Sequence, residues 1–226
     1  VQVSASFLSG SKIVCAAPAL PVGEVSVAAS NNGVDYATSE LVYNAHPVVE
    51  VLGVTPDLGS VEGGSSVTLH GSGFTNGSSL RCVFGNTEAV GASFISSNAI
   101  QCVTPASAVG SVIVGVLVNE FRSTQTGASY RFVEDPIVNS LWPRYGPAEG
   151  GTSLLVTGYN FLASGMLQCR FGANVVSARW ISSTQLECPS PESSSETGAV
   201  PVGVSLNALD FTPSALEYEY FNGPAL

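Results

Sequence analysis

Charged side chains are scarce in this sequence. Asp, Glu, Lys and Arg make up 11% of its 226 residues, whereas about 25% is usual in intracellular globular domains. Only 7 residues are basic, so the net charge is −10 at neutral pH. An acidic chain without a basic stripe lacks the electrostatic attraction that drives binding to nucleic acids or to anionic membrane surfaces. Nucleic acid is therefore excluded as an expected partner.

Long apolar runs and helix-forming residues are scarce as well. No stretch approaches the roughly 20 apolar residues that a membrane-spanning helix needs, so we expect no direct insertion of this segment into a membrane. The opening residues Val1–Ser4 predict a strand and lack the basic start of a signal peptide. The chain has one Met and one Lys (Lys12), while Val, Ser, Thr and Gly are frequent. This composition favours short strands and frequent turns.

Patterns of catalytic or metal-binding residues are missing too. The only histidines are His46 and His70, and the 5 cysteines show no C-x-x-C spacing, which excludes the common zinc sites. The serine run at 193–195 has no G-x-S-x-G context. Glu134 and Asp135 offer too few oxygen ligands for calcium. We therefore expect no enzymatic activity, no cofactor and no metal ion.

What the sequence does contain is a repeat of about 87 residues. Cys82 and Cys169 are 87 positions apart, and Cys102 and Cys188 are 86 apart. Other shared elements flank both pairs: a proline at 56 and 143, E-G-G at 62–64 and 149–151, G-x-x-F at 71–74 and 158–161, and F-G at 84–85 and 171–172. Cys15 lies 87 positions before Cys102, which indicates a truncated copy at the start. A repeat of this length indicates an array of small domains.

The repeat predicts three units. Residues 1–46 form an incomplete one, and residues 47–133 and 134–226 form complete ones. The first unit holds only the later strands of the pattern, so we expect upstream chain or a partner strand to complete its core. The linkers His46-Pro47 and Glu134–Pro136 are short and contain no Gly/Ser run, which predicts a fairly stiff array.

Each unit is expected to be an immunoglobulin-like β-sandwich. Residues 66–70 and 80–84 alternate between polar and apolar with period two, which is typical of half-buried strands. Residues 71–73 are expected to break the first of these strands, and residues 111–118 form a long apolar strand. About seven short strands, separated by Gly, Pro, Asn and Ser, predict the fold class: all-β, with tandem immunoglobulin-like β-sandwiches.

Two explanations fit the paired cysteines. They form disulfides within each domain, Cys82–Cys102 and Cys169–Cys188, or they are buried free thiols in a reducing compartment. Repetition of the pair and the scarcity of charge favour disulfides, which persist outside the cytosol. Each would stabilise its domain by roughly 3 kcal/mol, which matters for a small core. Cys15 has no partner in this segment: its partner lies upstream, or it is free, or it pairs between chains.

These features resemble the IPT/TIG family of immunoglobulin-like domains, found in plexins, hepatocyte-growth-factor-type receptors and fibrocystin-like proteins. The matching residues of the second unit are Val54, Pro56, Gly59, Gly63, Gly64, Gly71, Phe74, Cys82, Phe84, Gly85, Cys102 and Pro105. Those of the third unit are Pro143, Gly146, Gly150, Gly151, Gly158, Phe161, Cys169, Phe171, Gly172 and Cys188. The first unit matches only at Cys15, Pro18 and a hairpin over 30–36.

The resemblance implies a function as well as a fold. Tandem copies with paired cysteines are similar to the extracellular branch of the family, whereas the acidic charge departs from its transcription-factor branch. We therefore expect a non-enzymatic structural or adhesive segment of a large extracellular or cell-surface protein: a receptor ectodomain, an adhesin or a surface-filament subunit. Its partners would be other proteins, further domains of the same chain, or a filamentous assembly.

The alternative is a carbohydrate-binding or accessory module of a secreted enzyme. Stacking on a sugar requires exposed aromatic side chains. Trp142 and Trp180 fall at core-like positions of the family, which ranks this alternative lower. One modification is also predicted: Asn76-Gly77-Ser78, in a loop after Phe74, is a candidate N-glycosylation site.

Overall fold

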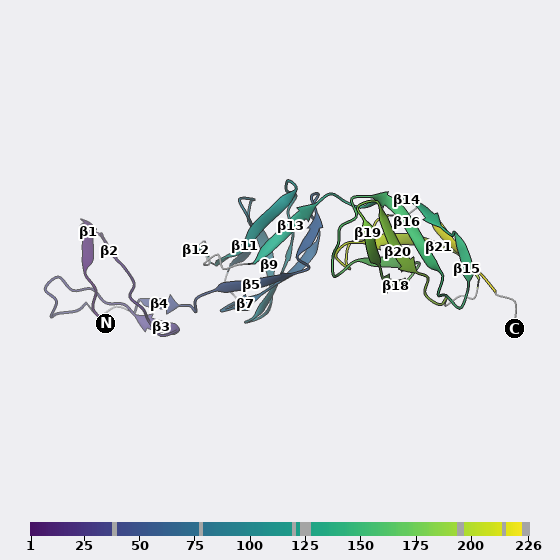
Figure 1. Cartoon of the computed structure of the whole chain (residues 1–226). Coiled ribbons are helices and arrows are strands. Elements are labelled where there is room, and N and C mark those ends of the chain that lie inside the picture. Colours follow the sequence, from purple (N-terminus) through teal and green to yellow (C-terminus); the bar gives the residue numbers. More distant parts are fainter. Residues whose placement is uncertain are drawn as a thin grey trace. The chain divides into compact units, whose positions relative to one another are not determined.

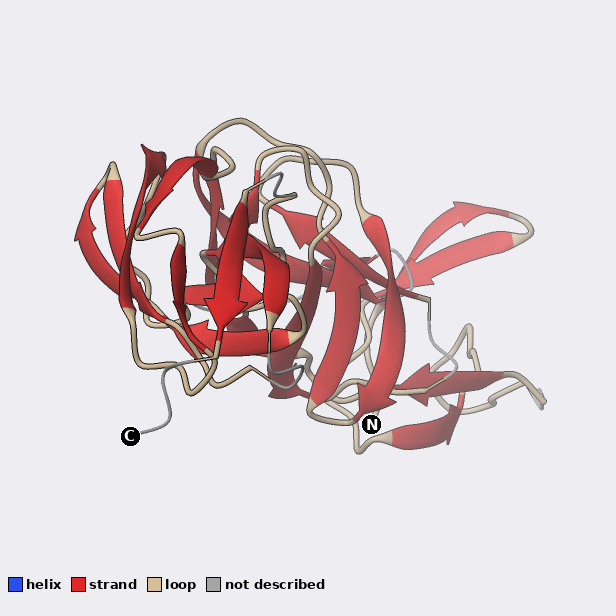
Figure 2. Cartoon of the chain, turned by 90° about the vertical axis from the view of Figure 1, so that its right-hand side faces the viewer, coloured by secondary structure: helices blue, strands red, loops and turns tan. Residues whose placement is uncertain are grey.

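The computed structural model describes residues 1–37, 40–76, 79–118, 121–122, 128–193, 197–213 and 216–222. Within them every regular element is a β-strand, as Figure 2 shows. The prediction of an all-β fold is thus confirmed. The chain divides into two compact units, Val1–Val48 and Val49–Leu226.

The first unit consists of two antiparallel hairpins. One pairs β1 (Ala5–Ser9) with β2 (Lys12–Cys15), and the other pairs β3 (Gly23–Ser26) with β4 (Val42–Ala45). None of its described residues is buried, and the Phe7 side chain is 75% exposed. In its described part this unit therefore has no hydrophobic core of its own.

The second unit begins with a sandwich that we call the first sandwich (Figure 1). Its strands are β5 (Glu50–Thr55), β6 (Leu58–Ser60), β7 (Ser66–Ser72), β8 (Leu80–Phe84), β9 (Val90–Ser96), β10 (Ala99–Val103), β11 (Gly110–Val118), β12 (Phe121–Arg122) and β13 (Ser129–Val133). The strand order is β5-β7-β10-β9-β8-β11-β13-β6, with β12 paired to β11. Because β9 pairs with both β10 and β8, it connects the two layers of the sandwich.

The second sandwich repeats this arrangement. Its strands are β14 (Ile137–Trp142), β15 (Tyr145–Pro147), β16 (Ser153–Tyr159), β17 (Gln168–Phe171), β18 (Asn174–Ser177), β19 (Arg179–Ser182), β20 (Gln185–Pro189), β21 (Gly198–Ser205) and β22 (Glu217–Phe221). They form two separate sheets, β14-β16-β20-β19 and β15-β22-β21-β17-β18.

Alternation along the strands builds both cores. In β7 the side chains of Val67 and Leu69 are fully buried, while the residues between and beside them face outward or lie partly exposed. Aromatic rings complete each core. The Tyr130 and Phe132 rings meet edge to face at 4.9 Å in the first sandwich, and those of Tyr218 and Tyr220 do the same at 4.9 Å in the second. Such pairs add to the stabilisation from burial.

The short strands β6 and β15 were not predicted from the sequence. The structure places β6 beside β13 in a parallel pair, and β15 beside β22 in the same way. Three residues are too few for a periodicity to be recognised. Strand β6 matters because its Leu58 lies in the apolar cluster that the first sandwich shares with the second.

A second difference concerns Gly71, which was expected to interrupt its strand. In the structure β7 runs through it to Ser72. A Cβ at Gly71 would overlap the carbonyl oxygen of Glu50 and would lie 2.9 Å from the ring of Phe74. The glycine therefore permits β5 and the Phe74 ring to pack closely on the strand, which explains the G-x-x-F spacing.

Candidate functional site: the contact between the two sandwiches

The paired cysteines connect the layers of each sandwich. Cys82 on β8 bonds to Cys102 on β10, with their Cα atoms 6.4 Å apart. Cys169 on β17 bonds to Cys188 on β20, with Cα atoms 6.2 Å apart. In the second sandwich these strands belong to different sheets. All four side chains are buried, so each bond is a covalent part of the core.

The other candidate residues lie at the surface of the chain. Cys15 on β2 is exposed and free. Asn76 is exposed in the turn after β7, while Gly77 and Ser78 of its sequon lie outside the described residues. His46 and His70 are both exposed. The described residues contain no cluster of three or more His, Cys, Asp or Glu side chains that could hold a metal ion.

Two aliphatic side chains of the first sandwich are buried in the contact with the second. Leu58 on β6 is 9% exposed, and Val133 at the end of β13 is 4% exposed. Both belong to the apolar cluster that forms the core of the second sandwich, together with Leu206. Removing these side chains from water therefore stabilises the contact in the same way as it stabilises a core.

A loop between β21 and β22 supplies the polar half of this contact. The side-chain nitrogen of Asn207 donates to the carbonyl oxygen of Leu58 at 3.2 Å and to Oδ2 of Asp210 at 2.8 Å. The hydroxyl of Ser65 donates to the same Asp210 oxygen at 2.5 Å. Ser65 and Asn207 are 1% and 2% exposed. The donor side chains are thus out of water, where an unpaired polar group is costly, while the Asp210 carboxylate lies at the exposed edge of the contact.

The linker between the sandwiches is held from both sides. The hydroxyl of Ser60 donates to the carboxylate of Asp135 at 3.0 Å, and the side-chain nitrogen of Asn160 donates to the Asp135 carbonyl oxygen at 3.0 Å. Asp135 thus contacts one residue of each sandwich. This observation agrees with a linker that restricts the movement of one sandwich relative to the other.

A buried tyrosine lies behind the Ser65–Asp210 contact. Burial raises the pKa of Tyr130, the hydroxyls of Ser65 and Thr104 lower it, and the Asp210 carboxylate raises it. The side chain therefore remains neutral at physiological pH. A Cβ on Gly59 would overlap the Tyr130 hydroxyl and would lie 2.6 Å from Oγ of Ser65. The motif glycine thus allows these hydroxyls to approach the end of β6.

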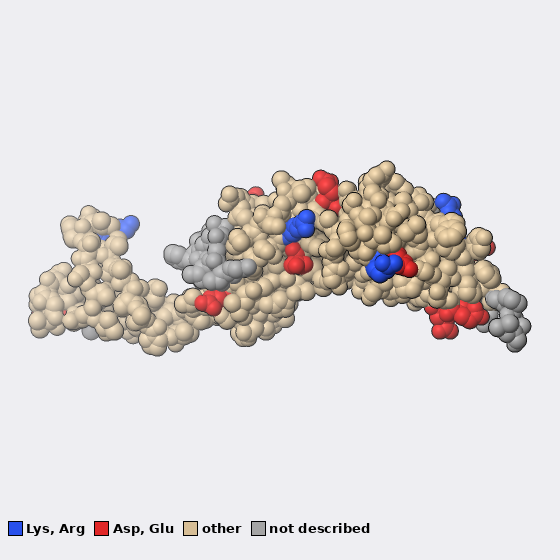
Figure 3. Space-filling model, viewed as in Figure 1, with Lys and Arg blue, Asp and Glu red and all other residues tan. Residues whose placement is uncertain are grey.

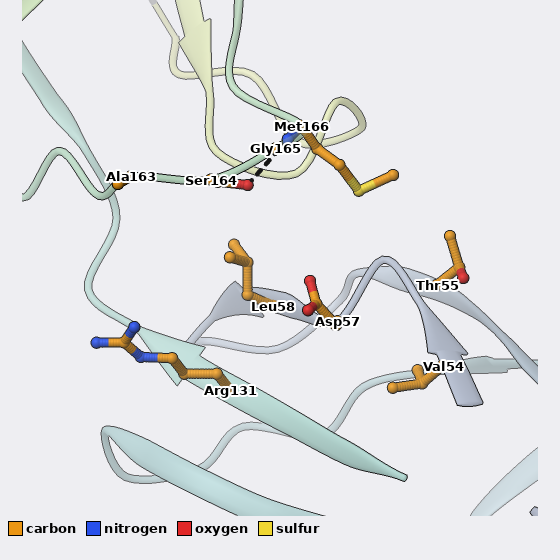
Figure 4. A pocket seen from close by; sticks show the side chains of 9 residues that line it. All are labelled: Val54, Thr55, Asp57, Leu58, Arg131, Ala163, Ser164, Gly165 and Met166. Carbon is orange, nitrogen blue, oxygen red and sulfur yellow. Dashed lines mark hydrogen bonds between the residues drawn. The ribbon is translucent and has the colours of Figure 1, made fainter. Parts of the chain in front are cut away.

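Beside the contact there is an open hollow of about 530 Å³. It is lined by Val54, Thr55, Asp57, Leu58 and Arg131 of the first sandwich and by Ala163, Ser164, Gly165 and Met166 of the second. Figure 4 shows Asp57 and Leu58 facing the loop that carries Ser164 and Met166. The lining brings together no nucleophile and base, so it offers no recognisable chemistry.

The placement of the two tryptophans was predicted wrongly. Trp142 is 75% exposed and Trp180 is 42% exposed. Leu141 faces the core, so its neighbour Trp142 on β14 points outward. Trp180 lies on the edge strand β19, where its ring nitrogen donates to the Phe161 carbonyl oxygen at 3.2 Å. The sequence pattern did not show which face of its strand each tryptophan occupies.

Trp142 begins a row of side chains across the outer face of its sheet. Leu155 is its neighbour on β16, Glu187 follows on β20, and Arg179 completes the row on β19. Glu187 and Arg179 form an ion pair. The Ser153 hydroxyl and the Arg179 guanidinium hold the pKa of Glu187 below its ordinary value. The outer face is thus mixed in character, with charges that are paired.

Two consecutive immunoglobulin-like sandwiches, each with a disulfide between layers and joined by a buried contact, define a tandem β-sandwich protein. More narrowly, the chain belongs to the IPT/TIG domain family: the family model matches residues 50–132 and 136–220. The family predicted from the sequence is thereby confirmed.

Individual relatives are plexins and a fibrocystin-like protein that are much longer than this chain. Plexin-A2 of Mus musculus is 27% identical over 208 residues, which are 86% of this chain and 11% of that protein. Fibrocystin-L of Homo sapiens is 30% identical over 142 residues, 63% of this chain and 3% of that protein. The solved full extracellular region of Plexin A4 covers 83% of this chain with a TM-score of 0.55 and 20% identity, across 17% of its own length. The chain thus spans a small part of these relatives.

Proposed function

We propose that this chain is a non-enzymatic spacer segment of a large extracellular or cell-surface protein, in which it holds neighbouring domains in a defined arrangement. The observation that carries the proposal is the contact through the buried side chains of Leu58, Val133 and Asn207, to which Asp210 adds a hydrogen bond with Ser65. A contact with both an apolar core and paired polar groups favours one relative orientation. A flexible string of independent domains would not need it.

Location and partner class support the proposal. Disulfides within both sandwiches and the plexin relatives indicate an extracellular or cell-surface location. The relatives also favour contacts with other proteins or with further domains. The net charge is −10, and on the described part of the face in Figure 3 the Lys and Arg side chains are scattered singly, which argues against nucleic acid. No helix in the described residues is long and apolar enough to cross a membrane.

The sugar-binding alternative is not favoured, although its tryptophans are exposed. Trp142 lies close in sequence to Tyr145, and Tyr145 occupies the position that Leu58 holds in the first sandwich. In that sandwich the position is covered by a protein contact and not by a sugar-binding platform.

The contact should give the two sandwiches a fixed separation, which spin labels can measure. Labels at Ser93→Cys and Ser177→Cys, in a chain with Cys15→Ala, are expected to give a narrow distance distribution by pulsed electron paramagnetic resonance. Asp210→Ala should broaden it, because the buried Ser65 hydroxyl and Asn207 amide lose the carboxylate that accepts from them. Glu217→Gln, an exposed change on β22, serves as the matched control and should leave the distribution narrow. A broad distribution in the unsubstituted contact would contradict the proposal.

We also propose that Asn76 carries an N-linked glycan. Its side chain is exposed in the turn after Phe74, where an oligosaccharide would meet no core residue. Protein secreted from animal cells is expected to lose mass on treatment with peptide-N-glycosidase. Asn76→Gln should abolish that loss without changing secretion. An unchanged mass in the untreated and treated wild-type protein would refute the assignment.

A further inference from the structure

The end of the second sandwich has the same construction as the end of the first. In the first sandwich β6 pairs in parallel with β13, which places Leu58 opposite Arg131 and Ser60 opposite Val133. In the second, β15 pairs with β22 in the same way, which places Tyr145 opposite Glu219 and Pro147 opposite Phe221. Tyr145 therefore takes the position of Leu58, and Phe221 takes that of Val133.

The two ends differ in what covers them. Leu58 and Val133 are 9% and 4% exposed because the second sandwich lies over them. Tyr145 and Phe221 are 65% and 42% exposed, and their ring centroids are 6.4 Å apart. Trp142, 75% exposed, adds a third aromatic side chain near this end. We call Trp142, Tyr145 and Phe221 the aromatic end patch.

The polar groups behind the patch are repeated as well. In the first sandwich the amide of Ser65 donates to the Thr104 hydroxyl at 3.1 Å, and its own hydroxyl reaches Asp210. In the second, the amide of Thr152 donates to the Ser190 hydroxyl at 3.0 Å. Thr152 thus occupies the place of Ser65 and presents the same kind of hydroxyl donor.

A buried tyrosine hydroxyl adds an independent observation. A Cβ on Gly146 would overlap the hydroxyls of both Tyr218 and Thr152, so these two groups converge on the end of β15. The Tyr218 side chain is fully buried, and its hydroxyl has no hydrogen-bond partner among the described residues. The Tyr130 hydroxyl shows the same feature in the first sandwich, where a carboxylate-bearing loop covers the end. The polar groups behind the two ends are therefore built alike.

We propose that this end of the second sandwich is a docking site for a further immunoglobulin-like module that follows Phe221 in the same polypeptide. The module would place apolar side chains over the aromatic end patch, and a loop carboxylate would accept a hydrogen bond from Thr152. Asp210 makes the equivalent bond with Ser65 one sandwich earlier. The proposal deepens the spacer function and rests on it: the contact repeats along the array.

Charge at the two ends also distinguishes this contact from the earlier one. The first end carries Asp57 and Arg131, and the backbone N of Arg131 donates to the carbonyl oxygen of Asp57 at 2.8 Å. At the second end Arg144 and Glu219 hold these two positions, and the backbone N of Glu219 donates to the carbonyl oxygen of Arg144, also at 2.8 Å. The signs are exchanged.

Footprinting with hydroxyl radicals tests the docking site. The probe is the full chain extended after Phe221 by a copy of residues 134–222, so that the linker Glu134–Pro136 follows Phe221 as it follows Val133. The copy carries Tyr145→Ser and Phe221→Ser, so that labelling at these two positions reports on the original module alone. Labelling of Tyr145 and Phe221 in the original module is expected to fall several-fold relative to the unextended chain, towards the low exposure of Leu58. Asp210→Ala in the appended copy should restore labelling, and Glu217→Gln in that copy should not.

Each other outcome is decisive. Thr152→Val in the original module should restore labelling as Asp210→Ala does, and intact labelling patterns elsewhere verify that the variants fold. Full labelling of Tyr145 and Phe221 in the extended chain overturns the docking site, while a narrow distance across the first contact leaves the spacer function standing. Protection in the unextended chain that rises with protein concentration also overturns it, because a second copy would then be the partner.

Discussion

Replacing Cys169 and Cys188 together with alanine is expected to lower the free energy of unfolding of the second sandwich by about 3 kcal/mol. The bond closes a loop with a sequence separation of 19 and so restricts the unfolded chain. Both side chains are fully buried, so the truncation also leaves a void in the core. A domain of this size has little stability to spare.

Tryptophan fluorescence during urea denaturation measures this effect cleanly. Both tryptophans of the chain, Trp142 and Trp180, lie in the second sandwich, so the signal reports on that domain alone. Cys15→Ala is the matched control, since Cys15 is exposed and free, and its transition should not move. Reducing agent should shift the wild-type transition but leave that of the double variant in place. An unchanged midpoint in the double variant would show that the disulfide does not stabilise the domain.

Gly158→Ala is expected to destabilise the same sandwich by about 2–3 kcal/mol, because overpacking forces backbone and side chains apart. The added Cβ would overlap the carbonyl oxygen of Ile137 and would lie 2.7 Å from the ring of Phe161. The backbone oxygen belongs to β14, which pairs with β16 at this point and cannot rotate away as a side chain would. Phe161 is fully buried and has no free space to enter.

The same fluorescence measurement tests this prediction. Gly165→Ala is the control, because a Cβ at Gly165 meets nothing within 4 Å and its φ is not positive. The two variants add the same methyl group to the same domain, and only the first should lower the transition midpoint. Equal midpoints would mean that β14 and β16 can separate at little cost, and that the G-x-x-F spacing has another cause.

Features with a local signal could be predicted from the sequence. Strands such as β7 show alternation because one face is buried and the other is not. The cysteine pairs stand out because they recur with the same spacing in two copies. The missed features depend on contacts between distant segments. Ser65 and Asp210 are 145 positions apart, and neither residue is unusual in its own surroundings.

Side-chain direction was the other source of error. The family pattern shows that an apolar residue recurs near position 142, but Trp142 points outward because Leu141 occupies the inward position. A shift of one residue in a strand exchanges the two faces. The end of the second sandwich could therefore be recognised as an exposed aromatic surface only once the strand register was known.

The disulfide in each sandwich also limits how far the chain can lengthen under tension. If the ends of the second sandwich are pulled, residues between Cys169 and Cys188 stay enclosed by the covalent bond after the sheets have separated. Without the bond these 19 residues would extend by roughly 60 Å. The unfolded, oxidised domain is therefore shorter than a fully extended chain of the same number of residues. In an array of such domains the disulfides would set the maximum extension under tension, and reduction of the bonds would increase it.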